Sequence, residues 1–178
     1  MDGFHYSFSS IVDMISRVWR TLLLSFPYIG LIGAAATTNE TCNNLINTLK
    51  LDSSVKIILT KAYPDNTTFQ DPYSLAYSAP APYLPEFCRV YANISTSNQS
   101  SSLFEVWLPI NTWNGRYLTV GNGGAAGGVN YPDMGAGLRA GFATASTDGG
   151  HNSSVIDGAW QADNNEVITD FGWYISLR

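Results

Sequence analysis

Charged side chains are scarce in this 178-residue chain, at 13% of positions against about 25% in an average globular protein. A disordered chain combines high charge with low hydrophobicity, and 45% of these residues are hydrophobic, so the composition argues against disorder. Nine Lys and Arg face fourteen Asp and Glu, which leaves no basic stripe to neutralise nucleic-acid phosphates. Composition also excludes coiled coils, collagen and polytopic membrane proteins. The length fits one domain, or part of a larger one.

The amino-terminal apolar run falls short of the ~20 residues that a membrane span needs. This run, Thr21–Ile32, contains Pro27, follows Arg17 and Arg20, and precedes the small residues Gly33–Ala36. Basic, apolar and small segments in this order are typical of a secretory signal peptide, and Pro27 disfavours the alternative of an uncleaved anchor helix. The sequence therefore predicts a signal peptide over residues 1–36, a mature domain over 37–178, and a secreted, extracellular protein with no membrane attachment after cleavage.

Cysteine is nearly absent, and the two that occur are Cys42 and Cys88. In an oxidising compartment an even pair predicts a disulfide, with two free buried thiols as the alternative. Closing a loop of about 45 residues would stabilise the fold by roughly 4 kcal/mol. Five N-x-[ST] sequons are consistent with a glycosylated secreted protein. The glycosylation candidates are Asn39, Asn66, Asn93, Asn98 and Asn152.

Hydrophobic periodicity predicts an α/β fold. The pattern favours a helix over 41–50, a strand over 55–62, an extended Pro-rich surface loop over 63–87, and strands over 88–94 and 102–109. A strand over 116–120 then leads into a glycine-rich loop, followed by a helix over 131–140 and a strand over 141–148. Strand, loop, helix and strand in this order form a βαβ unit, so the sheet is expected to be partly parallel. Three aromatic residues on predicted strands are expected in the core: Trp107, Trp113 and Tyr117.

The loop Gly121–Gly128 carries the chemically informative pattern. Its glycines allow the backbone to present N–H groups to a ligand at the carboxyl end of a strand. Dinucleotide binding is one such use, but the spacing is GxGxxxG and no acid clearly follows about 20 residues later. The other is an oxyanion hole, for which the amides of Gly123 and Gly124 are the candidates and which Asn122 would help to orient. A purely structural turn remains the simpler alternative.

The segments Phe104–Pro109, Trp113–Gly128 and Ser146–His151 resemble the N-terminal part of the fungal tannase and feruloyl esterase family. The resemblance extends over residues 42 to 172. It implies a secreted serine carboxylesterase acting on phenolic acid esters, such as the feruloyl or galloyl esters of plant cell-wall polysaccharides and tannins. The fold it implies is a partial α/β-hydrolase-like core, an incomplete sheet with a βαβ unit. Cys42 and Cys88 stand where the family places an early disulfide.

The family's catalytic residues have no counterpart here. The resemblance places the nucleophile in a G-C-S-x-G-G turn, followed by an acid and a histidine, and a calcium ion in a lid; this sequence contains no G-x-S-x-G. The resemblance therefore implies that the chain is truncated before the nucleophile elbow and lacks the catalytic Ser, Asp and His. Such a chain would have no cofactor of its own and would be inactive alone. The end Trp173–Arg178 reads as unrelated sequence, as a read-through intron or a shifted frame would leave.

Ser146, Asp148 and His151 contain all three residue types of a catalytic triad. A triad requires the three side chains to converge in space, and neighbours at one strand end normally diverge. We expect His151 to be a loop residue near the pocket and Asp148 a hydrogen-bond acceptor. Two other interpretations stay open: a secreted glycan-binding module without catalysis, and a truncated product that does not fold because its sheet edge is unpaired.

Overall fold

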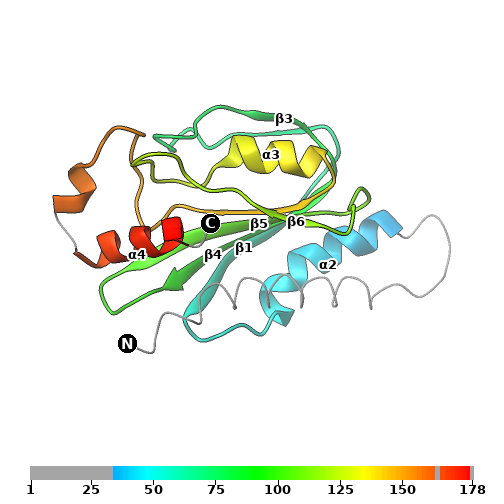
Figure 1. Cartoon of the computed structure of the whole chain (residues 1–178). Coiled ribbons are helices and arrows are strands. Elements are labelled where there is room, and N and C mark those ends of the chain that lie inside the picture. The colour runs from blue at the N-terminus through cyan, green and yellow to red at the C-terminus, as the bar shows by residue number, and fades with distance from the viewer. Residues whose placement is uncertain (1–33, 163–164, 177–178) are drawn as a thin grey trace.

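A computed structural model describes residues 34–162 and 165–176 as a layered α/β unit built on a five-stranded sheet (Figure 1). Residues 1–33 of the predicted signal peptide lie outside the described residues. Within the described ranges, no helix is both long and apolar enough to cross a membrane. The elements in chain order are α2 (Ala34–Thr48), β1 (Val55–Tyr63), β2 (Thr67–Phe69), β3 (Ala81–Leu84), β4 (Phe87–Ser95), β5 (Ser101–Pro109), β6 (Tyr117–Thr119), α3 (Tyr131–Arg139), β7 (Ala143–Thr147), the 3₁₀ helix η1 (Ala159–Ala162) and α4 (Asn165–Ser176).

The sheet has the strand order β1-β4-β5-β7-β6. Its first four strands pair antiparallel, with Val90 of β4 opposite Val106 of β5, whereas β6 and β7 pair parallel. Parallel neighbours need a crossover connection, and α3 provides it. The predicted βαβ unit and the mixed sheet are therefore confirmed.

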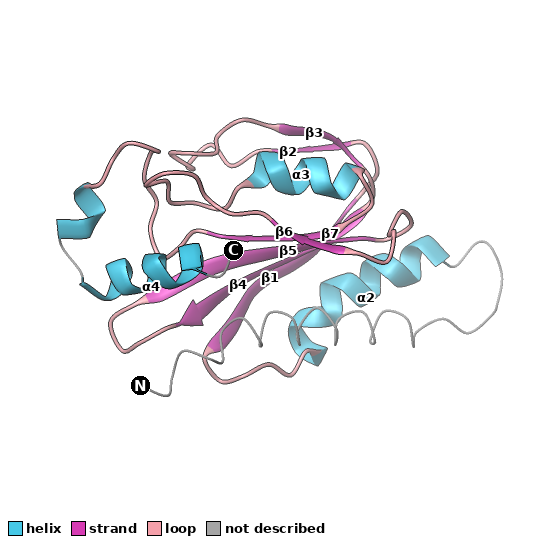
Figure 2. Ribbon diagram, in the orientation of Figure 1, coloured by secondary structure: helices cyan, strands magenta, loops and turns pink. Residues whose placement is uncertain are grey.

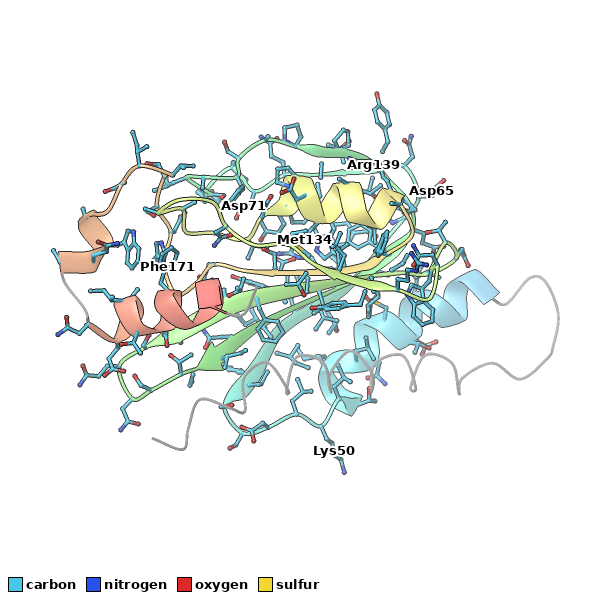
Figure 3. The ribbon with its side chains drawn as sticks, in the orientation of Figure 1. Lys50, Asp65, Asp71, Met134, Arg139 and Phe171 are labelled. Carbon is cyan, nitrogen blue, oxygen red and sulfur yellow. A yellow bond between two sulfur atoms is a disulfide. The ribbon has the colours of Figure 1, made fainter. Side chains whose placement is uncertain are left out.

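Each face of the sheet is covered by a different layer (Figure 2). Helix α2 packs on one face, where Cys42 and Leu45 are fully buried against the inward side chains of β4 and β5. The predicted disulfide between Cys42 and Cys88 is present and joins α2 to β4. On the opposite face lies α3, whose buried Met134 (labelled in Figure 3) joins a cluster around Trp107. Both faces of the sheet are thus buried over its centre.

Local sequence sets the ends of α3. The Asn130 side chain accepts a hydrogen bond from the backbone N–H of Asp133 at 3.2 Å, which caps the first turn, and Pro132 occupies a position where no intrahelical donor is needed. Gly141 follows the last turn with φ +83°, a conformation that favours glycine. The helix predicted over 131–140 is confirmed.

Two expectations about surface and core are wrong. The segment 63–87 is not simply an extended loop, because β2 and β3 pair antiparallel there and bury Phe69 and Leu84 over α3. These strands are too short for a readable alternation, and five prolines in the segment mask it. Trp113 is 37% exposed and donates its indole N–H to the carbonyl of Arg116, so it braces a turn instead of filling the core. Trp107 is fully buried as expected, and Tyr117 is half-buried.

Candidate functional site

The glycine loop Gly121–Gly128 follows β6 and precedes α3. Because β6 and β7 run parallel, their carboxyl ends lie at the same edge of the sheet. The segment after β7, residues 148–155, therefore runs beside the glycine loop, at the end of the molecule where α4 lies (Figure 1). The carboxyl edge of a parallel pair is where α/β proteins bind their ligands.

Backbone hydrogen bonds fasten the second half of this loop to the segment after β7. Ala125 N–H donates to the carbonyl of Val155 at 3.0 Å, and Gly127 N–H donates to that of Ser153 at 3.1 Å. A Cβ on Gly127 would come within 2.6 Å of the carbonyl carbon of His151, so only glycine allows this close approach. The loop is consequently held in one conformation by its neighbours.

The Asn122 side chain fastens the first half. Its amide group donates to the backbone carbonyl of Thr147 at 3.2 Å and so ties the loop to the end of β7. From the other end, the Asn130 amide donates to the carbonyl of Gly121 at 3.1 Å. This geometry agrees with the orienting role predicted for Asn122.

Gly123 and Gly124 form the exposed tip of the loop. Gly124 has φ +62° and lies against Val155, where a Cβ would come 3.0 Å from the valine side chain. The backbone N–H of Gly123 donates to the hydroxyl of Tyr77 at 3.1 Å. In the described part of the chain no hydrogen bond of the Gly124 N–H is found. The two amides lie at an accessible edge, and their role as an oxyanion hole stays a prediction.

Ser146, Asp148 and His151 do not converge. The Ser146 hydroxyl is 2% exposed and accepts a hydrogen bond from the backbone N–H of Asn130 at 3.1 Å. The ring nitrogens of His151 lie 3.2 Å from the carbonyl of Ala125 and 3.3 Å from that of Gly149. These side chains therefore form hydrogen bonds with nearby backbone groups and not with one another, so they do not form a triad.

Asp148 is the acceptor that its position predicted. One carboxylate oxygen accepts from the Ser102 hydroxyl at 2.9 Å and from the backbone N–H groups of Leu103 and Gly150 at 2.9 and 2.8 Å. Burial raises the pKa of Asp148 above its ordinary value, although these hydrogen bonds act in the opposite direction. The residue fixes the turn after β7 against β5.

Sequence reasoning missed a buried polar network beneath α3. Glu105 on β5 is fully buried and forms a bidentate ion pair with Arg89 on β4, with 2.7 Å from Arg89 Nε to Oε2. The same carboxylate accepts from the Trp107 indole N–H at 2.9 Å and from the Tyr131 hydroxyl at 2.7 Å. Burial, and then the charge of Glu105, raises the pKa of Tyr131 well above its ordinary range. The network anchors Tyr131, the first residue of α3, which follows the glycine loop after two intervening residues.

The only sequence signal for this network was a polar residue within the apolar strand Ser101–Pro109. Glu105 was read as part of an alternating strand, although it lies between buried residues on both sides. Two of its partners, Arg89 and Tyr131, lie 16 and 26 residues away in sequence, so no local pattern identifies them.

A second set of contacts joins α4 to the site. The ring of His151 stacks on Trp160 with centroids 3.7 Å apart. Phe171 of α4, labelled in Figure 3, meets both rings edge-on. Asp170 is 3% exposed and accepts hydrogen bonds from the hydroxyls of Thr96, at 2.6 Å, and Ser100 in the β4–β5 hairpin. Trp160, Asp170 and Phe171 are therefore an integral part of the packed structure.

The sequons lie in different surroundings. Asn39, Asn66, Asn98 and Asn152 are exposed, whereas Asn93 on β4 is half-buried and donates to the Ser101 hydroxyl at 3.1 Å. The described residues contain no group of three or more His, Cys, Asp or Glu side chains that could hold a metal ion. Glycosylation, and calcium in a lid, stay predictions.

Comparison with known proteins identifies relatives over most of the chain. The family model described as tannase and feruloyl esterase matches residues 88–177. An uncharacterised esterase of Xanthomonas campestris pv. campestris is 34% identical over 154 residues, 86% of this chain and 26% of that protein. A probable feruloyl esterase B-2 of Aspergillus flavus is 38% identical over 116 residues, 64% of this chain and 22% of that protein.

Among solved structures, feruloyl esterase B from Aspergillus oryzae matches with a TM-score of 0.63 and 30% identity, over 75% of this chain and 25% of that one. The chain thus spans about a quarter of the length of the relatives it matches. The family match runs to residue 177 and α4 extends to Ser176, so the interpretation of residues 173–178 as unrelated sequence is wrong for 173–177.

Proposed function

Since this chain belongs to the tannase and feruloyl esterase family, we propose that it forms the N-terminal part of a secreted serine carboxylesterase that hydrolyses phenolic acid esters. One structural observation carries this proposal. A glycine loop fastened on both sides presents the exposed residues Gly123 and Gly124 at the carboxyl edge of a parallel strand pair. The relatives are named as feruloyl esterases. We therefore propose phenolic esters of plant polysaccharides or tannins as the substrate class.

In this proposal the chain contributes electrostatic stabilisation. When a nucleophile adds to an ester carbonyl, negative charge develops on the carbonyl oxygen, and preorganised N–H donors stabilise that charge. Losing one such donor in related chemistry costs about 3–4 kcal/mol of transition-state stabilisation. The loop is suited to the task because its neighbours hold it in place before any substrate binds.

The nucleophile, acid and histidine belong, in this proposal, to a segment outside these 178 residues. The sequence has no G-x-S-x-G, and Ser146 is committed to the backbone of Asn130. Among the described strands, β6 pairs only with β7, so its other side can accept a further parallel strand. The carboxyl end of such a strand would lie beside the glycine loop, where a nucleophile turn would come close to Gly123 and Gly124. Calcium is proposed only for a lid outside these residues, and no step here uses it.

The test starts from the transcript. We expect the reading frame beyond codon 178 of a longer transcript to encode G-C-S-x-G-G, and its secreted product to hydrolyse methyl ferulate or methyl gallate. Replacing the serine of that motif by alanine should abolish hydrolysis, while the 178-residue chain alone should be inactive. Hydrolysis by the 178-residue chain that is lost in Ser146→Ala would overturn the assignment.

The glycan-binding alternative makes a different prediction. A binding module would be retained on a polysaccharide column and would hydrolyse no ester in any form. Retention without hydrolysis by the longest secreted product would favour that alternative over the esterase.

A further inference from the structure

A tyrosine hydroxyl contacts the exposed tip of the glycine loop through a hydrogen bond. Tyr77 belongs to the connection between β2 and β3, 46 residues from Gly123 in sequence, and its hydroxyl accepts the Gly123 N–H at 3.1 Å. Because this bond uses a lone pair of the oxygen, the hydroxyl hydrogen points elsewhere. In the described part of the chain this is the one hydrogen bond found for that hydroxyl, so its hydrogen is available to a ligand.

The backbone around Tyr77 is fixed by hydrogen bonds. Tyr77 N–H donates to the Ser74 hydroxyl at 3.0 Å, and Ser74 is 6% exposed. Asp71, labelled in Figure 3, accepts from the N–H of Tyr73 at 3.0 Å and closes the preceding turn. The segment 71–77 is therefore a braced turn that aims one side chain at the glycine loop.

The segment 71–77 is also hydrogen-bonded to the residues that follow β7. The side chain of Asn152 accepts from the N–H of Leu75 at 3.1 Å and donates to the carbonyl of Tyr73 at 3.0 Å. The Asn152 side-chain amide thus satisfies one backbone N–H and one backbone C=O of the segment, as a neighbouring strand would. Tyr77, the glycine loop and the segment after β7 consequently form one fixed assembly.

We propose that Tyr77 is a catalytic residue of the esterase reaction, donating its O–H to the carbonyl oxygen of the ester, with Gly123 as the residue that positions it. The inference rests on the proposed function. As the serine oxygen bonds to the carbonyl carbon, the π pair moves to the carbonyl oxygen, which accepts the Tyr77 O–H hydrogen bond. The tyrosine keeps its proton throughout, and when the ester C–O bond breaks, the serine proton leaves with the alcohol through the histidine.

The bond from Gly123 makes Tyr77 a better donor. An O–H whose oxygen already accepts a hydrogen bond is polarised and donates more strongly. The amide proposed as a direct oxyanion donor would thus act through the tyrosine, while the exposed N–H of Gly124 remains the second donor on the loop.

The experiment compares Tyr77→Phe with the wild type in the longest secreted product that contains these residues. The substitution removes one oxygen atom and leaves the ring. Active sites are counted by stoichiometric labelling with an organophosphorus reagent, so that kcat is expressed per folded site. We expect kcat on methyl ferulate to fall by about a hundredfold, the lower end for loss of an oxyanion donor, with KM changed less than about threefold.

Tyr83→Phe is the matched control, because Tyr83 lies on β3 with 74% of its surface exposed and should keep full kcat. An unchanged or increased kcat in Tyr77→Phe would mean that the hydroxyl is a placeholder displaced by substrate, and it would overturn the inference while leaving the proposed function intact. A wild-type product that labels with the reagent but hydrolyses no phenolic ester would overturn the proposed function itself. Thermal unfolding midpoints of both variants should match the wild type.

Discussion

Replacing Glu105 by glutamine tests how strongly the buried network supports the site. The carboxylate is fully buried and is paired with Arg89, whose side chain is 13% exposed. Glutamine has the same shape but carries no charge, and its NH₂ group would face the guanidinium, the Trp107 indole or the Tyr131 hydroxyl, all of which donate to this carboxylate. The substitution therefore leaves a buried positive charge without its partner.

The magnitude follows from that loss. Breaking a buried ion pair by removing one partner costs about 3–5 kcal/mol. The lower end, about 3 kcal/mol, applies here because Arg89 retains some water contact and packs over the Phe69 ring at 4.7 Å. In a domain of this size each kcal/mol lowers the unfolding midpoint by roughly 2–4 °C, so a fall of about 6–12 °C is expected.

Thermal and urea unfolding of the disulfide-intact protein measure the effect. The matched control is Glu40→Gln on α2, an exposed glutamate whose replacement should change stability by less than about 0.5 kcal/mol. A third variant, Arg89→Met combined with Glu105→Gln, removes both charges and should recover part of the loss. If Glu105→Gln is as mild as Glu40→Gln, the carboxylate is not the anchor described here.

Three further predictions concern other parts of the fold. Burial raises the pKa of Asp148, so the folded state binds more protons than the unfolded one. The free energy of unfolding should therefore fall as the pH rises from about 4 through the folded pKa. In Asp148→Asn this fall should be smaller between about pH 4 and 7, and an equal slope in the two proteins would contradict the prediction. Replacing both Cys42 and Cys88 by alanine opens a loop with a sequence separation of 46 and should cost about 4 kcal/mol in urea unfolding; a loss below about 1 kcal/mol would show that the bridge contributes little. Gly127→Ala should destabilise by 3 kcal/mol or more, roughly the upper range of overpacking, because its Cβ meets the His151 backbone, whereas Gly123→Ala has no atom within 4 Å of its Cβ and should unfold like the wild type.

Much of the fold is predictable because its signals are local. The alternation in β4 and the spacing of Met134 and Leu138 reflect periods of two and 3.6 residues along the chain. The short apolar runs of β5 and of the strands around the glycine loop are equally local signals. The small strands β2 and β3 escaped prediction because three or four residues do not establish a period.

Some features of the candidate site were likewise predictable from the sequence, and others were not. The sequence by itself determined the glycine loop, its place between a strand and a helix, the pair of cysteines and the family. Only the tertiary structure decided that Tyr77 meets Gly123, that Glu105 finds Arg89 and Tyr131, and that Ser146 faces a backbone N–H and no histidine. The physical reason is that backbone conformation follows from neighbouring residues, whereas a hydrogen bond between residues distant in sequence depends on the path of the whole chain between them.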